Sequence, residues 1–199
     1  MAVLTNKVHF GLKNAYYAPV TEVTTTSGTS TTYGTPVALS GAVSLTLSSD
    51  QETSNFYADD GVYYITQSDA KYSGELEIAD IPDQFYKDIF GDTEDSSGAL
   101  VEISANAIKY FALLFETSGD AGGHRTVLYK CSATRPTVNG KTKEDSVEVQ
   151  TQTISLSAIP RADVDTIGGA SKHIVQSNVK EGASAYANFF SAVYEPTFT

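Results

Sequence analysis

The sequence predicts a mainly β protein, a β-sandwich or open barrel with one flanking helix and a helical C-terminal extension. Short stretches alternate apolar and polar residues with a period of two, which is typical of strands with one buried face. The stretch 110–116, YFALLFE, is apolar at nearly every position and predicts a central strand covered on both faces. Two further stretches space their apolar residues three and four apart, which indicates short helices.

The strand-like stretches follow one another along most of the chain. Alternation is clear in residues 8–12, 42–49, 74–80 and 125–133. Leu128 breaks the alternation of the last of these. The segment 21–36 is rich in Thr and Ser, has little apolar content, and predicts either a hairpin tip or a linker.

The stretch 81–91, IPDQFYKDIFG, predicts the flanking helix. Pro82 suits the first helical position, because its missing N–H has no partner there in any case. Phe85 and Ile89 lie one turn apart and would face the core, and Gly91 is a stop signal.

A second helix is expected from Ala183 to Tyr194, where aromatic side chains recur at spacings of three and four. It packs either on its own sandwich or on a neighbouring subunit, and we favour the neighbour. The expected organisation is a β domain at 1–162, which includes a long loop at 48–74, and a C-terminal arm and helix at 163–199.

The composition excludes several classes of protein. A net charge of −11 opposes tight binding of nucleic acid, which requires clustered Lys and Arg. The single Cys131 excludes an internal disulfide framework and predicts a buried structural thiol. We expect neither a signal peptide at the N-terminus nor membrane insertion, because no apolar run approaches the roughly 20 residues that a membrane helix needs.

No catalytic pattern is present in the sequence. Arg135 stands where a phosphate-binding loop ending at 140–142 would need a glycine. The acidic stretch 92–98 lacks the alternating ligands of a calcium loop. His9 and His124 are far apart and neither lies in a ligand pattern; the same holds for His173. We therefore expect a protein that is not an enzyme and that has no cofactor and no metal site.

The long loop is the most unusual part of the chain. It carries Phe56, Tyr57, Tyr63, Tyr64 and Tyr72, although connections in compact domains are usually short and polar. The sequence Asp59-Asp60-Gly61 predicts a turn, so that the flanking residues would form an extended hairpin. Tyrosine suits surfaces that are buried only on association.

Five stretches occur in order at sensible spacing: NFYADDGVYY, YSGELEIADIPDQFYKDIFG, RTVLYKCSATRP, TKEDSVEVQTQTISLSAIPRAD and YANFFSAVYEP. This series resembles the major tail protein, or tail tube protein, of long non-contractile-tailed bacteriophages. The resemblance covers nearly the whole chain and is weakest at 21–36 and 163–183.

The resemblance implies a structural virion protein. In that family the subunit is a β-sandwich with a helix on its side, and hexameric rings stack into a tube. The tube surrounds a tape-measure protein, meets distal tail and tail-terminator proteins at its ends, and later conducts DNA into the host without binding it specifically. The expected location is the virion tail, with assembly in the host cytoplasm.

In that family a long loop joins one ring to the next, and we expect the aromatic loop to do so here. The predicted inter-subunit residues are Phe56, Tyr57, Asp59, Asp60, Tyr63, Tyr64 and Tyr72. A lumen through which DNA slides is expected to be acidic. The candidate lumen acids are Glu75, Glu77, Asp80 and Glu148, which lie at outward positions of strand-like stretches.

The main alternative is a virion decoration protein or a carbohydrate-binding β-sandwich, in which the Tyr-rich loop grips a ligand. Removing the loop distinguishes the two hypotheses. A tube subunit would lose stacking and stay folded, whereas a binding module would keep its oligomeric state and lose ligand affinity.

Overall fold

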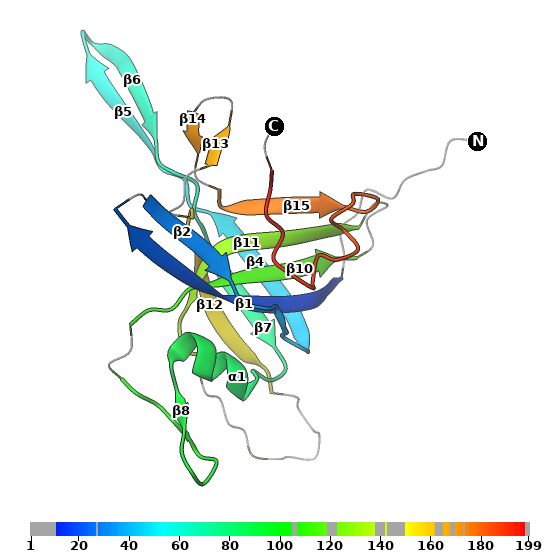
Figure 1. Ribbon diagram of the computed structural model, residues 1–199. Helices are drawn as coiled ribbons and strands as arrows, with labels where there is room; N and C mark the ends of the chain where they lie inside the picture. Colours follow the sequence, from blue (N-terminus) through cyan, green and yellow to red (C-terminus); the bar gives the residue numbers. More distant parts are fainter. Residues whose placement is uncertain are drawn as a thin grey trace.

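The protein is mainly β with one short helix, as the sequence predicts. The computed structural model describes residues 11–26, 28–104, 107–118, 123–137, 142, 150–161, 165–167, 170–172 and 174–197 (Figure 1). The strands are β1 (Leu12–Thr25), β2 (Gly28–Tyr33), β3 (Val37–Ala38), β4 (Ala42–Ser49), β5 (Thr53–Ala58), β6 (Gly61–Gln67), β7 (Tyr72–Ile78), β8 (Thr93–Glu94), β9 (Leu100–Val101), β10 (Phe111–Thr117), β11 (His124–Ala133), β12 (Gln152–Ala158), β13 (Asp165–Ile167), β14 (Ala170–Lys172) and β15 (Gln176–Lys180).

One antiparallel sheet organises the molecule, in the order β2-β1-β10-β11-β12-β7-β4, with β3 beside β1 and β15 beside β11. The long strand β11 changes partner along its length. Its first half, His124–Leu128, pairs with β15, and its last residues, Cys131–Ala133, pair with β12. The sheet therefore divides at β11, and both parts contribute side chains to one core cluster.

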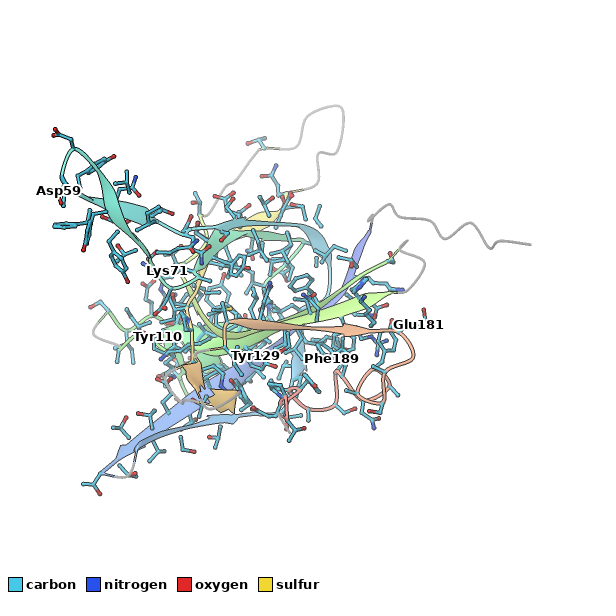
Figure 2. All side chains as sticks on the ribbon, turned by 90° about the horizontal axis from the view of Figure 1, so that it is seen from above. Asp59, Lys71, Tyr110, Tyr129, Glu181 and Phe189 are labelled. Atoms are coloured by element: carbon cyan, nitrogen blue, oxygen red, sulfur yellow. The ribbon has the colours of Figure 1, made fainter. Side chains whose placement is uncertain are left out.

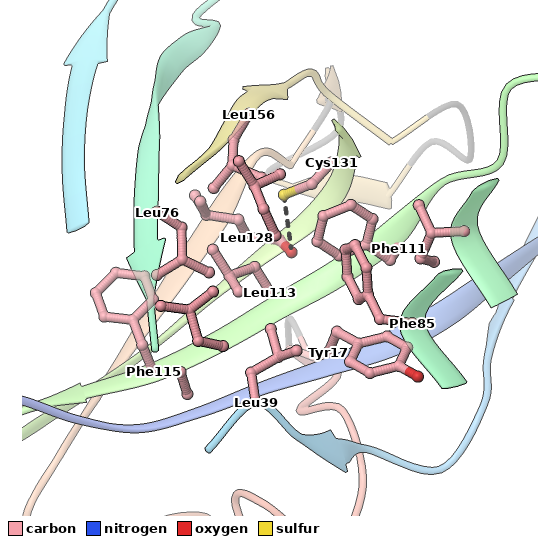
Figure 3. Close-up of a cluster of buried hydrophobic side chains, with 14 of the residues drawn as sticks. Tyr17, Leu39, Leu76, Phe85, Phe111, Leu113, Phe115, Leu128, Cys131 and Leu156 are labelled. Carbon is pink, nitrogen blue, oxygen red and sulfur yellow. Dashed lines mark hydrogen bonds between the residues drawn. The ribbon is translucent and has the colours of Figure 1, made fainter. Parts of the chain in front are cut away.

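The first core cluster is aromatic at its centre. Phe85 is fully buried, and its ring meets the rings of Tyr17, Phe90 and Phe111 edge-on at 4.9–5.6 Å. Leucines and isoleucines of β7, β10 and β12 surround these rings (Figure 3). Cys131 lies in the same cluster, and burial raises the pKa of its thiol to about 12, which confirms the buried thiol that the sequence predicts.

The flanking helix is confirmed and closes this cluster. Helix α1 (Asp83–Phe85) follows Pro82 and continues as the π-helical segment η1 (Tyr86–Phe90). Phe85 and Ile89 both point into the core. Gly91 ends the helix with a φ of 75°, a left-handed conformation that glycine adopts without steric cost.

The strand β10 is covered on both faces, as its apolar sequence predicts. Phe111, Leu113 and Phe115 belong to the first cluster, whereas Ala112 and Leu114 belong to a second cluster on the opposite face. The neighbouring strand β11 contains a bulge, because Phe111 pairs with Cys131 but Leu113 pairs with Leu128. This bulge turns Leu128 and Cys131 to the same side, which explains why Leu128 breaks the alternation.

The predicted helix from Ala183 to Tyr194 is wrong, because this segment forms consecutive turns. Its backbone hydrogen bonds span three residues, as from the Tyr186 N–H to the Ala183 carbonyl at 3.0 Å. Four of its twelve residues are alanine, the strongest helix former, so intrinsic propensity does not explain the turns. Packing therefore decides its conformation.

The segment packs on its own chain, which is the alternative that we did not favour, since its apolar side chains cover the second cluster. Phe189 and Val193 are buried there. Arg125 places its guanidinium 3.8 Å from the centre of the Tyr186 ring and donates a hydrogen bond to the Tyr186 carbonyl. With β15 in the main sheet, residues 174–194 are packed against the β domain.

Candidate assembly surface

The loop at 48–74 contains a two-stranded hairpin that projects from the body of the protein (Figures 1 and 2). Strands β5 and β6 pair antiparallel from Thr53–Gln67 at the base to Ala58–Gly61 at the tip. The two turn residues, Asp59 and Asp60, have φ values of 51° and 61°. Positive φ at both residues indicates a type I′ turn, whose twist matches that of the two strands. The predicted hairpin and its turn are confirmed.

The base of the hairpin is closed by backbone contacts. The Ser68 N–H donates to the Glu52 carbonyl at 2.9 Å, and the Glu52 N–H donates to the Ser68 hydroxyl at 2.9 Å. One step further down, the Asp50 N–H donates to the Lys71 carbonyl at 2.9 Å. Above this base, Thr53–Gln67 form hydrogen bonds within the hairpin, as Thr66 does with Ser54. No other described part of the chain forms a hydrogen bond or ion pair with them.

The hairpin exposes large apolar side chains. Phe56, Tyr57, Val62, Tyr63, Tyr64 and Ile65 are between 49% and 73% exposed. A single hairpin is at best marginally stable in water, and contiguous apolar surface of this kind marks an interaction site on a soluble protein. The hairpin is therefore the strongest candidate for a functional surface.

The apolar side chains lie on both faces of the hairpin. Tyr57 pairs with Val62 and Asn55 pairs with Ile65, which places Tyr57, Val62 and Ile65 on one face, called face A here. Phe56 pairs with Tyr64 on the opposite face, called face B. A bulge leaves Tyr63 as an extra residue, and the contact of its ring with that of Phe56, 6.5 Å between centroids, indicates that it belongs to face B.

The structure brings together most of the predicted inter-subunit residues, but Tyr72 lies apart from them. Tyr72 begins β7, packs against the first core cluster and accepts a hydrogen bond from the Gln176 amide at 3.1 Å. The sequence reasoning missed Val62 and Ile65, although the unbroken apolar run at 62–65 could have indicated them.

A second exposed apolar surface lies near the helix and β9. Val101, Ile103 and Ile108 are exposed, the last by 74%. Ile103 and Ile108 line a groove of about 310 Å³ together with Ile89, Phe90, Lys109 and Arg135. The helix and the β5–β6 hairpin extend toward opposite ends of the molecule in Figure 1. The sequence reasoning missed this surface, whose signal was the apolar alternation in 99–103.

The cations of this groove differ in their partners. Arg135 forms ion pairs with Asp92 and Glu102, and its guanidinium lies over the Phe90 ring. Lys109 donates to the Lys87 carbonyl at 3.3 Å and has no carboxylate partner among the residues described. Lys109 is therefore a cation of the groove that is free to meet a carboxylate of a partner.

The candidate lumen acids lie on or after β7. Glu75 is exposed and Glu77 is half-buried, and Asp80 is exposed in the connection to the helix. The Glu77 carboxylate accepts hydrogen bonds from the Ser44 hydroxyl at 3.0 Å and the Thr151 hydroxyl at 2.7 Å. Glu148 lies outside the described residues.

Glu75 and Glu77 belong to a polar face of the sheet. Apart from Val43, the exposed residues of β4, β7 and β12 are Ser, Thr and Glu, and none of the three strands contains Lys or Arg. This face therefore presents hydroxyl groups and negative charge without a basic residue on these strands.

No model of a protein family matches the chain, and no curated protein sequence matches it. In the described ranges, no helix is long and apolar enough to cross a membrane.

Proposed function

We propose that this protein is a structural subunit that assembles with copies of itself through the β5–β6 hairpin. The form of assembly that fits best is the stacked, hexameric-ring tube of long non-contractile phage tails. The main observation that supports this proposal is the hairpin, which exposes six large apolar side chains to solvent. A monomer gains nothing from such a surface, because apolar area stabilises only when it is removed from water.

The two exposed apolar surfaces support a head-to-tail contact. The hairpin combines apolar faces with the acidic tip Asp59-Asp60 and has no basic residue between Thr53 and Gln67. The groove beside the helix combines exposed isoleucines with Lys109. Complementary surfaces at different places on one chain make heterologous contacts, which generate rings or open stacks instead of closed pairs.

The acidic face of the sheet supports a conduit for DNA. A surface of hydroxyls and carboxylates repels phosphate, so a polyanion passes along it without adhering. Under this proposal Glu75, Glu77 and Asp80 face the lumen together with Glu148. The tape-measure, distal tail and tail-terminator proteins are then the expected partners, and the virion tail is the final location.

A deletion tests the proposed function. Residues Thr53–Gln67 are replaced by Asn-Gly, which joins Glu52 to Ser68 across their existing hydrogen bonds. We expect a folded monomer that forms neither rings nor tubes in negative-stain electron microscopy and sedimentation velocity, under conditions in which the intact chain assembles.

Folding of the deletion variant is checked with Cys131. The buried thiol is protected from labelling in the folded state, so labelling at the rate of the intact monomer indicates an intact core. Long tubes formed by the deletion variant would contradict the proposal. A change in ligand binding with no change in oligomeric state would instead favour a binding module.

A further inference from the structure

Both faces of the β5–β6 hairpin expose large apolar side chains to solvent. Face A carries Tyr57, Val62 and Ile65, and face B carries three aromatic rings. All six side chains are about half exposed or more. A hairpin is a single layer with its side chains directed to opposite sides. A partner surface that lies against one face therefore leaves the other face in water.

The chain offers no described cleft that could enclose both faces at once. The groove beside the helix measures about 310 Å³, which suits a small ligand or a few side chains. The other two described hollows have similar volumes of about 330 and 380 Å³. A layer covered on both sides needs a slot about 20 Å wide, twice the usual distance between packed sheets.

One face is also too small to hold two subunits together. A large aromatic side chain buries about 150–250 Å² on complete burial, so the three partly exposed rings of face B supply about 300–500 Å², and face A, with Val62 and Ile65, supplies less. A stable interface buries about 800 Å² on each partner. A contact through one face alone falls well below this value.

We propose that each hairpin is inserted between two neighbouring copies of the chain, which cover face A and face B respectively. This inference rests on the proposed function, and it sets the smallest complete stacking contact at three chains. A pair of chains leaves three large apolar side chains exposed. Assembly is therefore cooperative, because a hairpin binds fully only where two receiving subunits already lie side by side.

Two matched triple variants test the proposal. One replaces face A (Tyr57→Ser, Val62→Ser, Ile65→Ser), and the other replaces face B (Phe56→Ser, Tyr63→Ser, Tyr64→Ser). We expect each to raise the critical concentration for assembly at least about a hundredfold, because each removes a comparable buried apolar area. The critical concentration is measured by sedimentation of a concentration series.

The outcomes separate this inference from the proposed function. If one triple variant assembles at the critical concentration of the intact chain, the hairpin lies on a single partner and the inference is wrong, while the proposed function stands. If both triple variants and the Asn-Gly deletion assemble normally, or the intact chain does not assemble at any concentration, the proposed function fails as well.

A covalent readout counts the chains directly. A photo-crosslinking phenylalanine analogue is placed at both Tyr57 and Tyr63, one on each face. The doubly substituted chain is diluted into a large excess of intact chain, so that each labelled hairpin meets only unlabelled neighbours. Denaturing gels are expected to show a product of three chains. Products of two chains only, at every dose of light, would overturn the proposal.

Discussion

Two long two-stranded ribbons of this protein differ in chemistry more than in shape. The β5–β6 hairpin exposes aromatic and aliphatic side chains on both faces. The ribbon formed by the outer part of β1 with β2, from Val20 to Tyr33, consists mainly of threonine and serine. Its exposed residues bond to one another, as Thr24 and Thr29 do through their hydroxyls at 3.2 Å.

The ribbons also differ in how they are attached. The β1–β2 ribbon continues a core strand, and Glu22 forms an ion pair with the buried Lys130 at 2.6 Å. The Lys130 ammonium lies 4.5 Å from the centre of the Tyr110 ring, and Tyr33 packs against the second core cluster. The β5–β6 hairpin has no such anchor among the described residues.

A ribbon that projects from the body is therefore not, by that fact alone, an interaction site. A polar ribbon tied to the body is stable as part of the monomer, because its hydroxyls stay hydrated and its base is packed. An apolar hairpin without an anchor is incomplete until a partner covers it. The side chains and the attachment, taken together, distinguish the two.

Replacing the apolar side chains of the β5–β6 hairpin by threonine is expected to have the largest effect. Threonine at all six exposed apolar positions of the hairpin would make it resemble the β1–β2 ribbon while keeping a high strand propensity. We expect the critical concentration for assembly to rise at least about a thousandfold, since each large apolar side chain contributes about 1.5–3 kcal/mol when it is fully buried.

The matched control shortens the polar ribbon. Val23 and Ser30 are register partners, so Asn-Gly can join them in place of Thr24–Thr29. We expect this variant to assemble at less than about ten times the normal critical concentration, a difference of about 1.4 kcal/mol. Equal loss of assembly in both variants would show that the chemistry of the exposed faces is not what distinguishes the ribbons.

Breaking the anchor of the polar ribbon is expected to have an intermediate effect, on the monomer. Glu22→Gln removes the charge that compensates the buried Lys130. Breaking a fully buried pair costs about 3–5 kcal/mol, and we expect the low end of this range because the Glu22 side chain is 22% exposed. Urea unfolding of the monomer measures the loss. Glu52→Gln, at the exposed base of the hairpin, serves as control and should change stability by less than about 0.5 kcal/mol. Similar losses in the free energy of unfolding for both variants would contradict the proposal that the β1–β2 ribbon is anchored to the body and the hairpin is not.

Single truncations are expected to have the smallest effects and to differ between the ribbons. Tyr33→Ala should lower the free energy of unfolding of the monomer by about 2 kcal/mol, because its ring packs 6.1 Å from that of Tyr129. Phe56→Ala should lower it by less than about 0.5 kcal/mol. Both values come from the same urea titration. A large loss for Phe56→Ala would mean that the hairpin folds back on its own core in solution.

Local signals predicted much of the fold. The alternation of β4, β7 and β11, the central position of β10 and the helix at 81–91 all follow from spacing, because burial imposes the period on the sequence. Asp59-Asp60-Gly61 predicted the hairpin turn in the same way. These features depend on residues close together in the chain.

Tertiary packing accounts for the errors and omissions. The segment from Ala183 to Tyr194 has helical spacing, but Arg125 and the second cluster hold it as turns. Tyr72 resembles its aromatic neighbours in the sequence, and its position in β7 places it against the core. The groove at Ile103 and Ile108 forms only where distant segments meet, so no local pattern identifies it completely.

Selection for assembly and selection for folding act on different residues of this protein. Its exposed side chains are not part of either core cluster, so substitutions there leave the subunit folded. Under the proposed function, the hairpin and its receiving surfaces can change together from lineage to lineage while the fold is conserved. Two diverged subunits made in one cell would then form separate assemblies, because each hairpin would bind only the receiving surfaces of its own type of subunit.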